Sequence, residues 1–155
     1  MTHIEKLENA FVNYLTGLTV WTDGLLVLAG ENNVDKDAAR IVAYVEGGEL
    51  EDEEPPLSGN RPASVVVELR TPFTKLTAKE IAAGTTQPLL QHQANAAALQ
   101  AAISSATLDD QLTAAIAGFT VLGIHNRSEI YGQEENYWMG GWRVRLLSCP
   151  KSFAN

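Results

Sequence analysis

The chain has 155 residues, is 45% hydrophobic and carries 19 acidic against 11 basic residues, a formal net charge of -8. This size suits one domain that folds without disulfides or structural metals. The negative balance argues against phosphate binding as the main activity, because that needs basic side chains gathered on one face. The sequence lacks both a secretory signal pattern and an apolar run of the roughly 20 residues that span a bilayer. We therefore expect neither secretion nor membrane contact, and the single Cys149 fits a reducing compartment.

The chain opens with the clearest helix signal in the sequence. Thr2 and Glu5 have the spacing of a capping box, in which each residue satisfies a backbone N–H of the other. Apolar residues then recur at helical spacing from Ile4 to Leu15, and Gly17 supplies a stop. This pattern predicts an amphipathic helix at the start of the fold.

Strands are expected to follow this helix. Short apolar runs bounded by glycines predict buried strands over residues 25–29 and 40–45. Residues 64–70 alternate, so the odd-numbered side chains are expected to face the core and the even-numbered ones a wetter side. Pro72 should end that strand, since proline cannot donate to a ladder.

Six of the 19 acids lie between Glu46 and Glu54, and no base accompanies them. Such a charge density cannot offset the entropy of a packed structure, and the prolines and glycine that follow favour turns. We expect a mobile acidic loop over residues 46–62. Its carboxylates lack the register of a calcium loop, so a solvated charge run is the interpretation.

The second half contains a long stretch without charge. The 28 residues from Ile81 to Leu108 include no Asp, Glu, Lys or Arg, and the alanine-rich part over 89–106 predicts a helix. A helix on the outside of a monomer usually shows a charged face. This one is expected to be covered on more than its core side, by its own sheet and loops or by a neighbouring subunit.

The remaining pattern predicts a short helix over 108–117, capped by Thr107, and then two strands. The strand over 119–124 is apolar on both faces and is expected to be central, whereas 142–147 alternates and should be half exposed. The polar residues 126–136 between them are expected to form a connection of unassigned role. Together these elements predict one α+β domain over residues 1–155, with helices packed against a mostly antiparallel sheet of about four to five strands.

No catalytic or cofactor-binding constellation emerges. The sequence contains neither a nucleophile elbow nor a phosphate-cradling glycine loop, and His3, His92 and His125 are too scattered to form a helical metal pair. His125 with Glu129 could serve as a metal site or an acid–base pair, or simply as a strand-end histidine beside a loop carboxylate. We expect no enzyme activity, no cofactor and no metal.

Aromatic and arginine side chains gather near the C-terminus, among them Tyr137, Trp138 and Arg143. These residue types suit a base-stacking surface, a protein interface or the domain's own core. The Met139-Gly140-Gly141 sequence is expected to form a bend or bulge between the aromatic groups.

In order and length, these pieces resemble the tail-terminator, or head–tail joining, minor proteins of long-tailed double-stranded-DNA bacteriophages. The resemblance covers nearly the whole chain, from the amphipathic first helix through Val65–Pro72 and the His92 helix to the strand from Trp142 to Leu147. It implies a subunit that forms a ring with its own copies, typically a hexamer, at the head-proximal end of the tail. The ring would contact the tail-tube protein and a head-completion or connector protein, with DNA passing through it without sequence-specific binding.

This resemblance implies a virion protein that is made and assembled in the bacterial cytoplasm. Within it, we assign two hypothetical surfaces. The subunit interface would include Gln91, Asn95, Gln100, Tyr137, Trp138 and Arg143, and a lumen or docking loop would include Glu49, Glu51, Asp52, Glu53 and Glu54. The alternatives are a small cytosolic enzyme using His125 and Glu129, or a general cytosolic adaptor.

Overall fold

The computed structural model describes residues 2–30, 38–46, 59–72, 78–84, 87–133 and 137–150. The helices in these ranges are α1 (His3–Thr16), α2 (Ala78–Ala82), α3 (Gln87–Ile103) and α4 (Leu108–Ala115). The strands are β1 (Leu26–Ala29), β2 (Arg40–Val45), β3 (Arg61–Pro72), β4 (Phe119–Gln133) and β5 (Tyr137–Pro150). No helix in the described ranges is long and apolar enough to cross a membrane.

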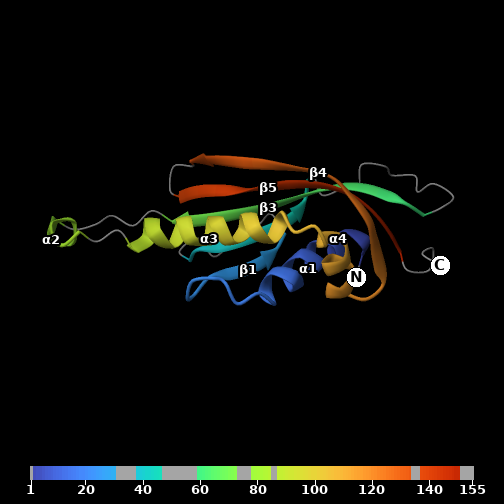
Figure 1. Cartoon of the computed structure of the whole chain (residues 1–155), viewed down its shortest axis with the longest axis horizontal. Helices are drawn as coiled ribbons and strands as arrows, with labels where there is room; N and C mark the ends of the chain where they lie inside the picture. The colour runs from blue at the N-terminus through green and yellow to red at the C-terminus, as the bar shows by residue number, and fades with distance from the viewer. Residues whose placement is uncertain are drawn as a thin grey trace.

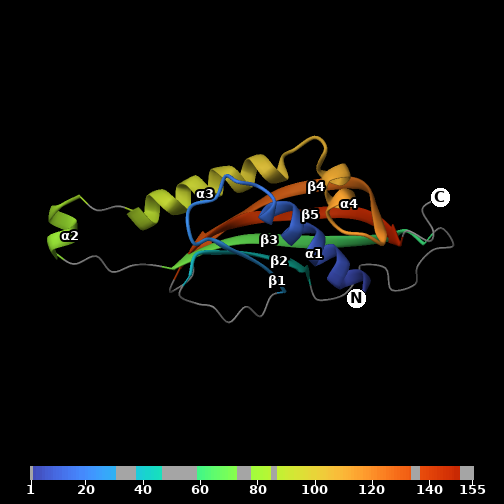
Figure 2. The same ribbon diagram turned by 90° about the horizontal axis from the view of Figure 1, so that it is seen from below.

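The strands form one five-stranded sheet in the order β1-β2-β3-β5-β4. β1 runs parallel to β2, and the other three neighbouring pairs are antiparallel. α1, α3 and α4 pack against one face of this sheet, called the inner face below (Figures 1 and 2). The predicted α+β fold with a mostly antiparallel sheet is therefore confirmed.

A single hydrophobic cluster lies between the helices and the inner face. β3 supplies its middle, because Val65, Val67 and Leu69 all point to the helices and are fully buried. The helices contribute apolar side chains at helical spacing to the same cluster: Leu7, Phe11 and Leu15 from α1, Leu99 and Ile103 from α3, and Leu108 and Leu112 from α4. Each fully buried leucine-sized side chain contributes about 1.5–3 kcal/mol, so this layer is the main source of stability.

The start of α1 confirms the predicted capping box. The Thr2 hydroxyl accepts the Glu5 N–H at 3.1 Å, and a Glu5 carboxylate oxygen accepts the Thr2 N–H at 2.6 Å. Gly17 caps the other end, where its N–H donates to the carbonyl of Asn13 at 3.1 Å. Thr107 occupies the N-cap position of α4 as predicted, but its side chain makes no cap hydrogen bond and instead lies 3.2 Å from the Ser105 hydroxyl.

Two expectations for the last strands are wrong. The apolar run 119–124 belongs to an edge strand, β4, because β5 lies on one side of it and no described strand lies on the other. Its outward side includes Leu122, which is 44% exposed. Residues 126–133 of the expected connection are not a loop either, because β4 continues to Gln133, while residues 134–136 lie outside the described residues.

The bulge expected at Met139-Gly140-Gly141 lies elsewhere. These residues keep a regular register with both β3 and β4, whereas β4 shifts register between Val121 and Gly123 and again between Ile124 and Asn126. Gly141 has a different role. A Cβ at this position would overlap the Val67 carbonyl oxygen on β3, so glycine allows the backbones to approach closely.

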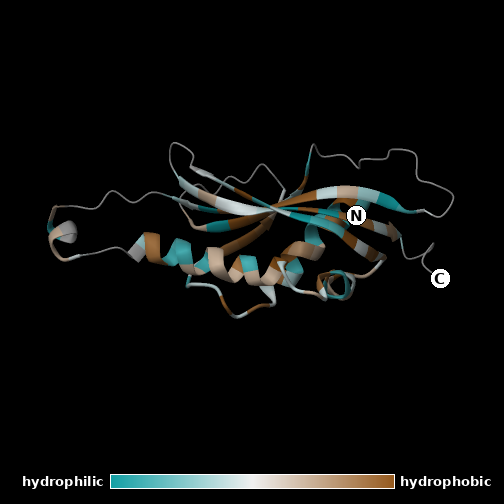
Figure 3. Cartoon of the chain, turned by 45° about the horizontal axis from the view of Figure 1, so that its top comes forward, coloured by the Kyte–Doolittle hydropathy of each residue, from teal (hydrophilic) through white to brown (hydrophobic). Residues whose placement is uncertain are grey.

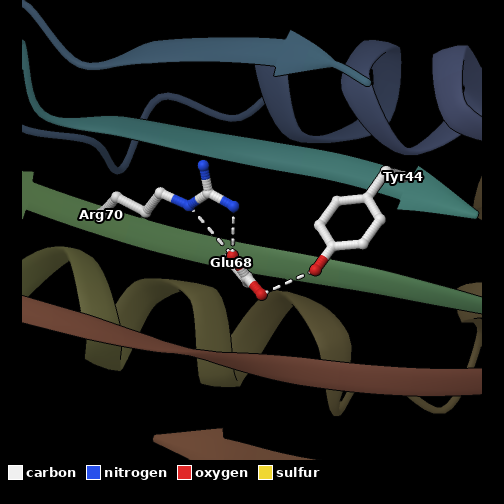
Figure 4. A network of polar contacts seen from close by, with 3 residues as sticks. All are labelled: Tyr44, Glu68 and Arg70. Atoms are coloured by element: carbon white, nitrogen blue, oxygen red, sulfur yellow. Dashed lines mark hydrogen bonds and ion pairs between the residues drawn. The ribbon is translucent and has the colours of Figure 1, made fainter. Parts of the chain in front are cut away.

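The outer face of β3 is drier than predicted. Val66 is only 3% exposed and Glu68 only 8% exposed. The Glu68 carboxylate is fully engaged, because one oxygen accepts the Tyr44 hydroxyl at 2.8 Å and the other accepts two Arg70 N–H groups at 2.6 and 2.9 Å (Figure 4). A buried carboxylate persists only with such partners, which explains how this charge lies in the middle of the sheet.

Candidate subunit interface

The inward side of α3 is fixed to the chain by a buried amide. Asn95 is 1% exposed, its side-chain oxygen accepts the Thr22 N–H at 3.1 Å, and its amide nitrogen donates to the Thr22 hydroxyl at 2.9 Å. Leu99 and Ile103 continue the same side into the core. The placement of Asn95 at a subunit interface was therefore wrong, because its polar groups are satisfied within its own chain.

His92 holds the first half of α3 against the sheet. Its Nδ1 lies 2.7 Å from the Thr71 hydroxyl of β3, and its ring lies 5.9 Å from the Trp138 ring at an interplanar angle of 36°. Burial lowers the pKa of His92, so the neutral ring is favoured in the fold. With Asn95 further along the helix, these contacts determine which side of α3 faces outward.

That outward side, called the α3 outer face below, has no charged residue. It consists of Leu89, Leu90, Gln93, Ala94, Ala97, Gln100 and Ala101. Leu89 is 39% exposed and Leu90 is 56% exposed. Along α3, bands of hydrophilic colour alternate with hydrophobic and neutral bands (Figure 3). Since the sequence of α3 has no ionic side chain, amide groups and histidine supply its polarity.

A hollow of about 290 Å³ separates α3 from the β4–β5 hairpin. Small side chains of α3, the Trp142 ring and two glycines line it, with Gln93, Gln100 and Glu129 as its polar groups. A Cβ added at Gly140 would meet nothing within 4 Å, which shows how open the floor is. Tyr131, which pairs across the hairpin with Gly140, is 79% exposed. The α3 outer face and this groove form a concave, weakly polar surface.

The structure divides the predicted interface between the two faces of the sheet. Gln100 is exposed on the α3 outer face, Gln91 is half-buried on the same helix, and Trp138 contacts His92 on the inner side. Tyr137 and Arg143, in contrast, lie on the outer face of the sheet, which is the face away from the helices.

On that outer face, the Tyr137 ring lies 5.8 Å from the guanidinium carbon of Arg40 and 5.9 Å from that of Arg70. Arg143 forms an ion pair with Glu46 at 2.8 Å. Only Gln91, Gln100 and Trp138 therefore remain as candidate subunit-interface residues on the α3 side of the sheet. The predicted acidic site residues, Glu49, Glu51, Asp52, Glu53 and Glu54, lie outside the described residues.

His125 and Glu129 do not come together. Both are exposed on β4, where four residues of extended backbone separate their Cα atoms by about 13 Å. They also line different hollows, since His125 borders one of about 410 Å³ with Arg145, and Glu129 borders the α3 groove. Among the described residues, no group of three or more His, Cys, Asp or Glu side chains could hold a metal. The geometry gives no support to the enzymatic alternative.

Sequence reasoning missed the contact of a half-buried histidine, which joins α1 to the last strand. His3 Nε2 lies 2.9 Å from the Ser148 hydroxyl, and the His3 ring meets Phe119 edge to face. Burial, followed by the positive charges of Arg61 and Lys6, lowers the pKa of His3 to about 4. Ser148 is 0% exposed, so this pair joins α1 to β5 rather than forming an accessible nucleophile. No local pattern could reveal partners 145 residues apart.

No protein-family model matches the sequence, and no curated protein matches it. The α3 outer face and the groove beside it are therefore the structural features from which a function can be proposed.

Proposed function

We propose that this chain is a structural virion protein of a long-tailed bacteriophage, which assembles with its own copies into a ring at the head-proximal end of the tail. The ring would terminate the tail tube and join it to the head connector. The observation that carries this proposal is the uncharged α3 outer face, on which Leu89 and Leu90 are 39% and 56% exposed. Apolar, charge-depleted patches of this kind are typical of protein interfaces.

The form of this surface supports assembly over catalysis. Interface cores are depleted in charge because an unpaired ion loses its hydration when a partner covers it. The α3 outer face offers neutral amides and alanines, which a partner can cover without that penalty. A contact between this face and a different surface of the next copy is heterologous, and a heterologous contact whose rotation closes produces a ring.

The expected partners follow from the resemblance. One side of the ring would contact the tail-tube protein and the other a head-completion or connector protein, and DNA would pass through the centre. The acidic sequence between Glu46 and Glu54 suits a surface facing DNA or a docking surface, because its negative charge repels the phosphate backbone and prevents sticking. We propose that assembly takes place in the host cytoplasm and that the virion contains the product.

Negative-stain imaging of the purified protein, alone and mixed with tail tubes, tests this function. We expect closed rings in the first sample and capped tube ends in the second. A protein that stays monomeric at high concentration and never binds tube ends would contradict the proposal. Rings that bind no tube would support assembly but exclude the terminator role.

A further inference from the structure

β4 leaves an open edge on the sheet. Within the part of the chain that the structure describes, β5 is its one partner strand, and β4 runs along the upper border of the sheet in Figure 1. From Asn126 to Gln133 its register with β5 is regular, because both irregularities lie before Asn126. A regular edge presents unpaired N–H and C=O groups in a row, which is a template for another strand.

Two opposite charges stand on this regular stretch. Arg127 and Glu129 lie on the same face of β4, two residues apart, opposite Val144 and Trp142 of β5. Arg127 donates one hydrogen bond to the Ser105 carbonyl at 3.0 Å, while its Nε is buried without a partner. Glu129 is exposed, and neither residue forms an ion pair within the described ranges.

We propose that β4 pairs antiparallel with β4 of a second copy, about a two-fold axis at Ser128. This register places Arg127 opposite the partner's Glu129, and Glu129 opposite the partner's Arg127. Opposite charges that face each other across a ladder stabilise it, and like charges destabilise it. The contact is isologous, so one favourable pair necessarily occurs twice.

Charge also selects this register over its neighbours. Side chains alternate between the two faces of a strand. A register that keeps the inner faces of both copies on the same side of the joined sheet therefore differs from the proposed one by moving the two-fold axis one residue along each strand. An axis at Arg127 would set the two Arg127 side chains opposite each other, and an axis at Glu129 would do the same with two carboxylates. Ser128 is the centre that pairs each charge with its opposite.

The irregularity before Asn126 limits the length of the new ladder. In the proposed register the stretch Asn126–Ile130 pairs with the same stretch of the second copy. Beyond it, Tyr131 would meet His125 of the partner subunit, where β4 already departs from regular pairing. A ladder this short belongs to the class of small, reversible interfaces. We expect a weak dimer whose affinity falls as salt screens the two ion pairs.

This dimer uses the β4 edge, whereas the ring contact uses the α3 outer face, so the two contacts are distinct although Glu129 also borders the groove beside α3. The inference does not depend on the phage function. A failure of β4 pairing leaves ring formation untouched, and a ring that fails to form leaves β4 pairing intact, so the two can be judged separately.

Disulfide trapping with Ser128→Cys tests the register. In the proposed dimer, the two copies of position 128 face each other with Cα atoms about 4.5–5.5 Å apart, which a disulfide spans. The matched control is Ile130→Cys, whose two copies would lie about 13 Å apart along the ladder. The native Cys149 is buried and does not interfere. We expect covalent dimers from Ser128→Cys and none from Ile130→Cys. Equal trapping of both, or no trapping of Ser128→Cys, would overturn the proposal.

Charge reversal in the Ser128→Cys chain provides the second test, with the yield of covalent dimer as the readout, because a ring formed through the α3 outer face does not produce this disulfide. Glu129→Arg should weaken the dimer at least tenfold, and Arg127→Glu should do the same. The double variant with both changes should regain the dimer, because each charge again meets its opposite. Circular dichroism confirms folding, which matters for Arg127→Glu because Arg127 also bonds Ser105. A double variant that gives no covalent dimer although it folds, or charge variants that dimerise as fully as Ser128→Cys alone, would contradict the register.

Discussion

Replacing Gly141 by alanine should destabilise the fold sharply, whereas the same change at Gly140 should not. An added Cβ at Gly141 would overlap the Val67 carbonyl oxygen and lie 2.9 Å from the Glu68 Cα, both of them backbone atoms of the central strand β3. Backbone cannot turn away as a flexible side chain does, so the β3–β5 pair must separate locally. Overpacking of this kind costs about 1–3 kcal/mol.

Gly140 is the matched control because it is the next residue on the same strand. Its added Cβ would meet nothing within 4 Å, and its φ is not positive. Alanine there should be neutral or stabilising by about 0.5–1 kcal/mol, since glycine loses more conformational freedom on folding. The two variants should therefore differ by roughly 1–4 kcal/mol in free energy of unfolding.

Equilibrium urea unfolding at low protein concentration measures this difference without a contribution from self-association. The slopes of the two transitions should agree, and the midpoint of Gly141→Ala should fall well below that of Gly140→Ala. Equal midpoints would refute the close approach of β5 to β3 on which the reasoning rests.

Three further outcomes follow from the polar contacts. Glu68→Gln should lower the free energy of unfolding by about 3–5 kcal/mol, because it leaves the Arg70 charge without its carboxylate. Glu46→Gln, the control, removes an exposed ion pair and should cost less than about 1 kcal/mol. Asn95→Ala should cost about 1–3 kcal/mol by removing both partners of the half-buried Thr22 N–H and hydroxyl, again measured in urea. The pKa of His3 is about 4 in the fold against an ordinary 6.5. The stabilising contribution of the neutral His3 ring to the free energy of unfolding is therefore fully present above pH 6.5 and is lost as the pH falls towards 4. His3→Gln should flatten the pH dependence of stability in that window, and an unchanged profile would contradict the burial of His3.

Local signals in the sequence predicted local structure well. The capping box at Thr2 and Glu5 was confirmed because its two partners lie three residues apart and need no tertiary context. Buried strands over 40–45 and 64–70 were confirmed for a similar reason, since their apolar patterns match the core residues of β2 and β3. The mostly antiparallel sheet followed from the order of these elements.

Strand order and helix orientation required information that the pattern lacks. β4 was expected to be central because residues 119–124 are apolar on both faces, but Leu122 stays exposed at an edge. The extension of β4 past Asn126 was missed because that part has no apolar alternation. On α3, amides occupy both sides, so nothing in the sequence distinguishes the buried Asn95 from the exposed Gln100.

The central claim is that the α3 outer face forms the contact between subunits, and a pair of identical substitutions tests it. Gln100→Glu places a charge on that face, while Gln111→Glu makes the same change at an exposed position of α4. An unpaired charge covered by a partner costs on the order of 2–3 kcal/mol, which is about 30- to 150-fold in each subunit contact. Sedimentation velocity should show the ring of the unaltered protein, the same ring for Gln111→Glu, and free subunits or β4-edge dimers for a folded Gln100→Glu. Rings that survive Gln100→Glu unchanged would contradict the account.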